Sequence, residues 1–168
     1  MTARKVMLLG EIGVGKTSLV RRLVLAKFDH DYKPTLGVDV YRYEVTPPPP
    51  QGPITLIVWD TDGNFGDSIF THTYMKQATA ALIIGDGTRR ATLDTMLRLR
   101  QGFRAAFPGR YDALIVNKTD LLTPGDEAAL PSELAAGRDG VFHTSAKTGD
   151  NVRTAFHDAA ASILRRGL

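Results

Sequence analysis

A glycine-rich segment near the amino end of the chain has the composition of a phosphate-binding loop. Residues 10–17 read Gly-Glu-Ile-Gly-Val-Gly-Lys-Thr and fit the pattern G-x-x-x-x-G-K-[ST], between an apolar run and a stretch with helical spacing. Backbone N–H groups wrapped around an anion at a helix N-terminus favour phosphate. Gly13 and Gly15 would let the backbone come close to a nucleotide. Lys16 would then reach the β- and γ-phosphates, and the Thr17 hydroxyl would bind Mg²⁺.

Two later segments contain groups that could recognise a nucleotide base. Residues 117–120 (Asn-Lys-Thr-Asp) follow an apolar run. The carboxylate of Asp120 could accept from N1–H and the N2 amino group of guanine together, whereas adenine would leave this buried carboxylate unpaired. Residues 144–147 (Thr-Ser-Ala-Lys) could offer backbone N–H groups to the guanine carbonyl, with Lys147 along the ring. Either segment alone could be a solvated turn, and their order behind the phosphate loop favours a guanine site.

Strand-like and helix-like segments alternate along the chain, which predicts an α/β fold of the P-loop NTPase type. We expect about six strands in a mostly parallel sheet, with one antiparallel strand and with helices on both faces. Ligands of such sheets bind at the carboxyl ends of the strands. The expected strands are residues 5–9, 38–45, 54–59, 80–84, 113–116 and 141–143. The expected helices are residues 16–26, 68–77, 91–107, 126–136 and 150–166, with Pro131 interrupting the fourth.

Length and composition exclude several classes of protein. The chain has 168 residues, which predicts a single domain over residues 1–168. A net charge of +3 is too small to indicate a nucleic-acid partner. The absence of cysteine removes prenylation and palmitoylation, and residue 2 is not the glycine that myristoylation needs. We therefore expect a cytoplasmic monomer without a covalent lipid anchor, recruited by other proteins.

Most other polar features have ordinary structural interpretations. The arginines at 89, 90, 98, 100 and 104 form a basic stretch that we interpret as a solvated helix face. The four histidines show no metal-ligand spacing and are expected to be structural or exposed. The prolines of residues 47–53 are expected to stiffen a hairpin between two antiparallel strands.

Taken together, these motifs resemble a small GTPase of the Ras superfamily along essentially the whole chain. Residues 32–39 are similar to the first switch and its following strand, and they resemble the Rab and Ran branches most. The resemblance implies that Phe28 packs on the guanine edge and that Thr35 is the second hydroxyl ligand of Mg²⁺. It also implies that Asp60 holds Mg²⁺ through a water and that the Gly63 N–H meets the γ-phosphate. Such a G domain acts as a switch. Its two switch loops are ordered by the γ-phosphate and Mg²⁺, and they are released after hydrolysis.

The resemblance supplies complete sets of expected site residues. The predicted GTP/GDP contacts are Gly13, Val14, Gly15, Lys16, Thr17, Ser18, Phe28, Tyr32, Thr35, Asp60, Gly63, Asn117, Lys118, Asp120, Ser145, Ala146 and Lys147. The predicted Mg²⁺ ligands are Thr17, Thr35 and Asp60, and the predicted catalytic residues are Lys16, Thr35, Gly63 and Asn64. Effectors, an exchange factor and a GTPase-activating protein are expected to bind the switch loops, residues 28–39 and 60–76.

The second switch departs from the family pattern. Residues 60–65 read Asp-Thr-Asp-Gly-Asn-Phe, where the family usually has Asp-Thr-Ala-Gly-Gln-Glu. Asn64 is one methylene shorter than the glutamine that orients water, and a misplacement of about 1 Å can cost about 100-fold in rate. Asp62 could turn outward, bind Mg²⁺ or a water, or destabilise the GTP-bound form. Ile12 could crowd an incoming arginine finger, and no arginine has an obvious finger position within the chain.

Three functions are compatible with these residues. The first is a guanine-nucleotide switch with slow intrinsic GTP hydrolysis. The second is a non-hydrolysing GTP/GDP-binding scaffold or sensor, in which Asp62 and Asn64 abolish turnover. The third is a P-loop kinase for a small molecule, against which residues 117–120 and Thr35 argue.

Overall fold

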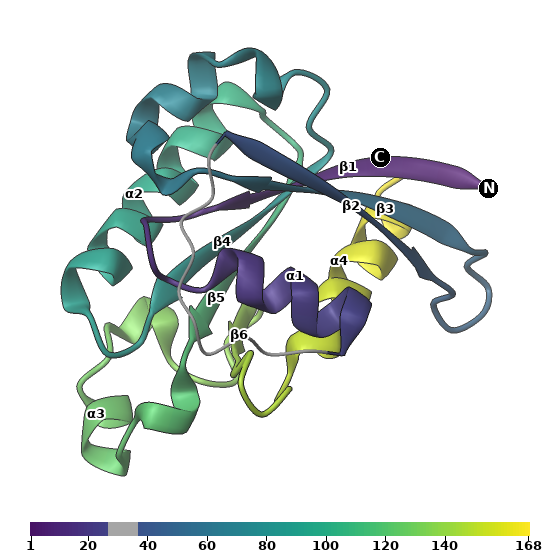
Figure 1. Ribbon diagram of the computed structural model, residues 1–168. Helices are drawn as coiled ribbons and strands as arrows, with labels where there is room; N and C mark the ends of the chain where they lie inside the picture. The colour runs from purple at the N-terminus through teal and green to yellow at the C-terminus, as the bar shows by residue number, and fades with distance from the viewer. Residues whose placement is uncertain (27–36) are drawn as a thin grey trace.

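The sheet that carries the site has six strands over the part of the chain that the structure describes. The computed structural model describes residues 1–26 and 37–168. The strands lie in the order β2-β3-β1-β4-β5-β6, with β2 antiparallel to β3 and every other pair parallel (Figure 1). Their bounds are β1 Thr2–Leu9, β2 Val38–Val45, β3 Ile54–Thr61, β4 Ala80–Asp86, β5 Tyr111–Asn117 and β6 Val141–His143. The predicted fold class is confirmed.

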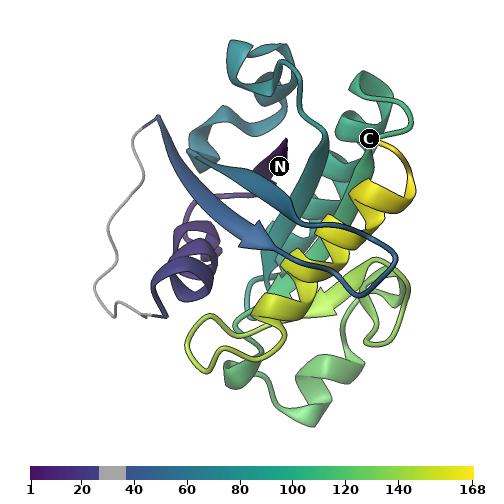
Figure 2. The same ribbon diagram turned by 90° about the vertical axis from the view of Figure 1, so that its right-hand side faces the viewer.

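Helices cover both faces of this sheet, with α2 on one face and α4 on the other (Figures 1 and 2). The α-helices are α1 Lys16–Leu25, α2 Arg90–Ala106, α3 Pro124–Ala128 and α4 Val152–Arg165. Short 3₁₀ segments complete the described elements: η1 Gly63–Thr71, η2 Thr73–Met75, η3 Thr119–Leu121 and η4 Ser132–Leu134.

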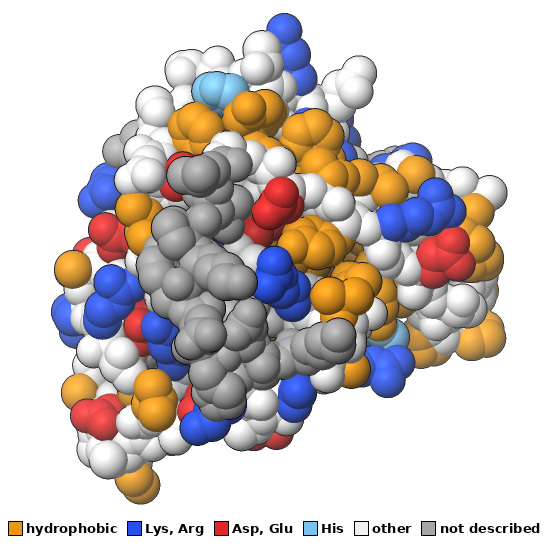
Figure 3. Space-filling model, viewed as in Figure 1, with side chains coloured by type: hydrophobic (Ala, Val, Ile, Leu, Met, Phe, Trp, Pro, Cys, Tyr) orange, Lys and Arg blue, Asp and Glu red, His pale blue; other side chains and the backbone are white. Residues whose placement is uncertain are grey.

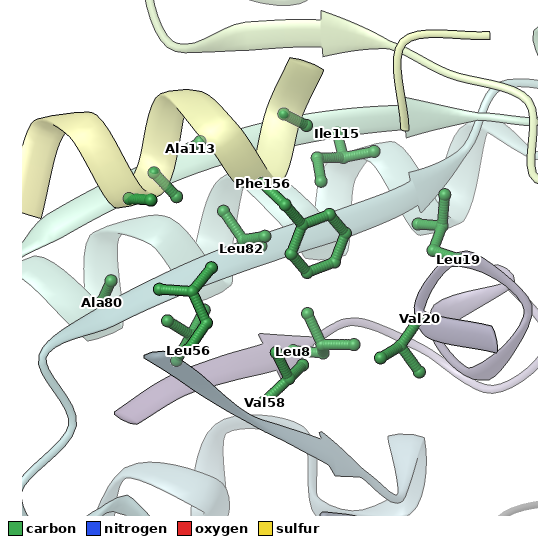
Figure 4. Close-up of a cluster of buried hydrophobic side chains, with 14 of the residues drawn as sticks. Leu8, Leu19, Val20, Leu56, Val58, Ala80, Leu82, Ala113, Ile115 and Phe156 are labelled. Carbon is green, nitrogen blue, oxygen red and sulfur yellow. The ribbon is translucent and has the colours of Figure 1, made fainter. Parts of the chain in front are cut away.

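The alternation of side chains along the central strands divides the core into two clusters. Leu8 and its alternate neighbours face α1 and α4, where Phe156 of α4 packs over the sheet (Figure 4). Met7 and Leu9 face the opposite side and pack with Met96 and other residues of α2. Both faces are buried along β4, along β5 and in the second half of β1, and these stretches are mainly apolar, as is typical of parallel strands.

The region after β3 differs from the predicted helix over 68–77. Two 3₁₀ segments replace it, because Gly66 has a non-helical backbone (φ 51°, ψ −139°) and His72 is extended (φ −77°, ψ 145°). The second segment therefore begins anew at Thr73. The first segment is held against α2 by Phe70, since a Cβ on Gly102 would lie only 2.4 Å from Cε2 of its ring.

Two further expectations need correction. The helix expected over 126–136 is instead α3, Pro124–Ala128, because Thr123 and Asp126 form a capping box at its start. The prediction of a solvated arginine face is wrong for Arg89, described below with the site, and for Arg100 and Arg104. The last two place Nε 2.8 and 2.7 Å from the carboxylate of Asp112. That carboxylate is buried, and a buried charge requires such partners.

Candidate nucleotide-binding site

The glycine-rich loop joins the carboxyl end of β1 to α1, as predicted. Gly13 and Gly15 have φ values of 76° and 101°, a left-handed conformation in which side chains are strained. A Cβ on Gly15 would also lie 2.3 Å from Nδ2 of Asn117. Glycine at this position therefore lets the loop pass directly against the end of β5.

Side-chain donors hold the carbonyl groups of this loop. Lys16 Nζ donates to the carbonyls of Gly10 and Glu11, each at 2.8 Å. From β5, the Asn117 amide donates to Val14 O at 3.0 Å. The C=O and N–H of a trans peptide point in opposite directions, so tethered carbonyls direct the following amides to the other side. Lys118 Nζ makes an equivalent contact with the Gly13 carbonyl at 2.8 Å.

The Lys16 ammonium lies in a buried, acidic setting. Burial lowers the pKa of Lys16 to about 8, although the nearby carboxylates of Asp60, Asp62 and Glu11 oppose the shift. The group therefore stays mostly charged at pH 7 despite its desolvation. A buried cation at a loop whose amides point one way provides a strong setting for an anion.

Asp60 and Thr17 form the candidate metal ligands. The Asp60 side chain is buried at the end of β3, and its Oδ2 accepts a short hydrogen bond from the Thr17 hydroxyl. Burial raises the pKa of the Asp60 carboxyl to about 6, against the opposing effects of Thr17 and Lys16. Among the described residues, its other oxygen, Oδ1, is buried without a hydrogen-bond partner. A carboxylate and a hydroxyl are hard oxygen ligands of the kind Mg²⁺ takes, so these residues fit the ion.

The two expected base-recognition segments lie together at the ends of adjacent strands. β5 and β6 are parallel, so residues 117–120 and 144–147 leave the sheet at the same edge. The side-chain oxygen Oδ1 of Asn117 accepts from Thr144 Oγ1 at 3.0 Å and from Ala146 N at 3.3 Å. Ser145 Oγ donates to Asp120 Oδ1 at 2.8 Å. The Ser145 bond orients the Asp120 carboxylate through one of its oxygens, and recognition of one base edge requires such an orientation.

The second switch begins directly on the phosphate loop. A Cβ on Gly63 would lie 2.4 Å from the Ile12 nitrogen, so this close approach needs glycine. Asp62 accepts a hydrogen bond from Asn64 N at 2.9 Å and caps η1. The charge of Asp62 also raises the pKa of Lys16, so this carboxylate lies close enough to act electrostatically on the phosphate-binding lysine. The side chain of Asn64 is exposed.

Three predicted site residues, Phe28, Tyr32 and Thr35, lie outside the described residues. Two residues of the site, Glu11 and Asp86, were not predicted from the sequence. Glu11 has a buried Oε2 that is unpaired among the described residues. Asp86 ends β4 and pairs with Lys118 at 2.9 Å. Its position at the carboxyl end of a buried strand was the available signal.

The fold and this loop define a P-loop nucleotide-binding protein of the α/β class. The sequence model of the Ras family matches residues 5–165. The chain belongs to this family, which confirms the resemblance. It is a GTP-binding molecular switch and a GTPase, and it is Rab-like. As in the family generally, regulators and effectors are its partners, and the small-molecule kinase alternative is wrong.

Several relatives are about one third identical to the chain over the aligned residues. Ras-related protein RABF2b of Arabidopsis thaliana is 32% identical over 164 residues, covering 96% of this chain and 81% of that protein. Ras-related protein Rab7 of Pisum sativum is 31% identical over 178 residues, with coverages of 99% and 84%. Ras-related protein Rab-36 of Mus musculus is 34% identical over 168 residues, with coverages of 94% and 60%. Within residues 1–26 and 37–168, no helix is long and apolar enough to cross a bilayer.

The raised pKa of Asp60 predicts a pH-dependent stability for the nucleotide-free protein. The pKa of Asp60 in the folded state, about 6, exceeds the ordinary value of 3.8. The stability that this shift contributes is therefore fully present below pH 3.8 and is lost as the pH rises through 6. Relative to Asp60→Asn, the wild type should gain about 1 kcal/mol of unfolding free energy from pH 7 to pH 5. Urea denaturation in EDTA measures this difference. Exposed Asp94→Asn is the control, and a difference independent of pH would contradict the prediction.

Proposed function

We propose that the phosphate loop, the start of the second switch and the two base-recognition segments form one GTP site within a single G domain. The residues proposed to contact nucleotide among those described are Gly13, Val14, Gly15, Lys16, Thr17, Ser18, Asp60, Gly63, Asn117, Lys118, Asp120, Ser145, Ala146 and Lys147. The carrying observation is that Asn117 bonds both the phosphate loop and the 144–147 segment. One side chain thereby couples the phosphate half of the site to its base half. Phe28, Tyr32 and Thr35 remain predicted members of the same site.

We further propose that Thr17 and Asp60 hold Mg²⁺, with Thr35 as the third predicted ligand. The unpaired, buried Oδ1 of Asp60 supports this proposal, since desolvated carboxylate oxygens need a cation or a donor. When bound, Mg²⁺ would neutralise phosphate charge. Thr17 and Asp60 keep hard oxygen atoms at the amino end of α1, and Lys16 supplies a separate fixed charge.

Recognition of guanine by Asp120 gives a direct test of the site. Asp120→Asn replaces one acceptor by an amide donor, so it should lose the paired bonds to N1–H and N2 of guanine. Two bonds to a charged group predict a loss of at least about 100-fold in GDP affinity, and a gain for xanthosine diphosphate, whose O2 accepts. Competition with a fluorescent guanine nucleotide measures both.

Asp94→Asn is the matched control for this experiment, because its carboxylate pairs with Arg90 in an exposed i,i+4 contact. It should leave all affinities unchanged. Stronger binding of ATP than of GTP by the wild-type protein would contradict the proposed site.

We propose that hydrolysis is slow because Asn64 is too short to orient the attacking water. Asn64→Gln restores one methylene and should raise the single-turnover rate of bound GTP by about tenfold, since small errors in position are costly. Chromatography of the bound nucleotide over several hours measures this rate. Asn64→Ala is the control and should not accelerate turnover. An unchanged rate in the glutamine variant would show that Asn64 is not the limiting defect.

The charge of Asp62 gives a separate prediction about the balance of nucleotide states. Asp62→Asn keeps an oxygen that can cap η1 and removes a carboxylate whose charge acts on Lys16. We expect the ratio of GTP to GDP affinity to rise by roughly three- to tenfold, because like charges repel but a half-exposed pair is screened. Equilibrium titration with both nucleotides measures the ratio. A constant ratio would mean that the carboxylate does not face the γ-phosphate.

We propose that effectors and regulators bind through residues 28–39 and 60–76, the switch loops of the resemblance. An aromatic cluster supports this location: Phe65 lies 4.8 Å from His72 and 5.9 Å from Tyr74, centroid to centroid. Trp59 lies 6.3 Å from Tyr74, with Lys5 Nζ 3.7 Å above its ring. Hydrophobic side chains gather on this side of the molecule and continue toward β2 and β3 (Figure 3). A cytoplasmic monomer that binds no nucleic acid remains our prediction.

A further inference from the structure

One arginine of the basic stretch lies on the phosphate loop. Arg89 precedes α2, and its Nη2 donates to the carbonyl of Ile12 at 2.8 Å. Its Nε lies 3.2 Å from Oδ2 of Asp86. The neighbouring Arg90 instead forms an exposed pair with Asp94. The expected solvated role therefore fits Arg90, whereas Arg89 has a defined acceptor 77 positions away in sequence.

Asp86 provides a rigid base for this contact. Its side chain is only 2% exposed, and Oδ1 accepts from Thr88 N at 2.9 Å and from Thr88 Oγ1 at 2.6 Å. Its Oδ2 meets both Arg89 Nε and Lys118 Nζ. One buried carboxylate thus holds two cations side by side. Lys118 alone would neutralise the Asp86 carboxylate. The bond from Arg89 to the Ile12 carbonyl therefore needs a separate explanation.

The two cations bond consecutive carbonyls of the loop. Arg89 takes Ile12 O, and Lys118 takes Gly13 O. With the bonds from Lys16 and Asn117, side-chain donors hold every carbonyl from residue 10 to residue 14. The Arg89 bond is therefore the member of this series that fixes the peptide between residues 12 and 13.

Fixing that peptide fixes an amide. The C=O of Ile12 and the N–H of Gly13 belong to one planar trans unit and point in opposite directions. Gly13 has no side chain and a φ of 76°, so its flanking peptides rotate at little steric cost without an external bond. A Cβ there would meet Arg89 Nη2 at 3.5 Å, which shows how closely the guanidinium lies along the loop.

We propose that Arg89 is a positioning residue for phosphate binding: anchored on Asp86, it holds the Ile12 carbonyl outward and so directs the Gly13 N–H toward the phosphates beyond the α-phosphate. This inference rests on the proposed GTP site and adds a residue to it. It requires the bond to Ile12 O as well as the charge, because a charge alone would leave the peptide free to rotate.

Dissociation of a fluorescent GDP analogue from the full chain tests the role of Arg89. Arg89→Ala should release GDP about tenfold faster. This is the effect expected when the Gly13 N–H, which donates to the charged phosphates, loses the one hydrogen bond that orients its peptide. Arg89→Lys should fall between the alanine variant and the wild type, since one ammonium cannot span both Asp86 and Ile12. Arg90→Ala is the matched control and should release GDP at the wild-type rate.

Two further readouts separate positioning from a general loss of stability. Competition by GMP, which lacks the β-phosphate, should be the same in the wild type and in Arg89→Ala. The ³¹P resonance of the β-phosphate in bound GDP should shift in Arg89→Ala and stay in place in Arg90→Ala.

Three results would overturn the inference: wild-type GDP release from Arg89→Ala, an equal loss of GMP competition, or an unchanged β-phosphate resonance. Failure of the proposed GTP site itself would be distinct, because the wild-type protein would then not retain GDP at all. Arg89→Gln, which keeps one donor, applies the same criteria if the alanine variant does not fold.

Discussion

The phosphate loop depends on one constraint: its carbonyls must be held away from the side where its amides bind an anion. No single element of the fold supplies the donors that do this. Lys16 comes from the first turn of α1, Asn117 and Lys118 from the end of β5, and Arg89 from the segment after β4. They meet because β1, β4 and β5 are adjacent and parallel, so their carboxyl ends share one edge. The strand order is therefore a requirement of the proposed site.

The same concentration of buried charge lowers the stability of the folded protein when no ligand is bound. Lys16 and Asp60 are both buried, and their pKa values move toward each other, to about 8 and about 6. Glu11 and Asp60 each have a buried carboxylate oxygen without a partner among the described residues. Leaving such groups unpaired costs stability that a bound cation and polyanion would restore. A ligand that binds only the folded state then stabilises it by mass action, so folding and nucleotide retention are coupled.

Local patterns in the sequence predicted the parts of this arrangement that are local. Apolar runs, together with the alternating pattern of residues 38–45, predicted the six strands, and the motif spacing predicted the loop between β1 and α1. What could not be predicted depends on contacts between distant segments. Asn117 was expected at the base, and the register of β4 and β5 also brings its amide onto Val14. Arg89 was read as solvated because a backbone carbonyl acceptor has no sequence signature. The 3₁₀ segments were missed because apolar spacing does not distinguish them from an α-helix.

Within the second switch, the η1 segment is constrained near both of its ends. At one end Gly63 lies against the backbone of Ile12, where no larger residue fits. At the other end Phe70 packs against Gly102, a position inside the last part of α2 where alanine would favour the helix but displace the ring. Between them, Gly66 breaks the helical path. A shift of the Ile12 peptide would therefore reach Gly63 first, because Gly63 contacts Ile12 directly and Phe70 is packed on α2. The segment before Gly66 is accordingly the part of the switch best placed to change with the nucleotide.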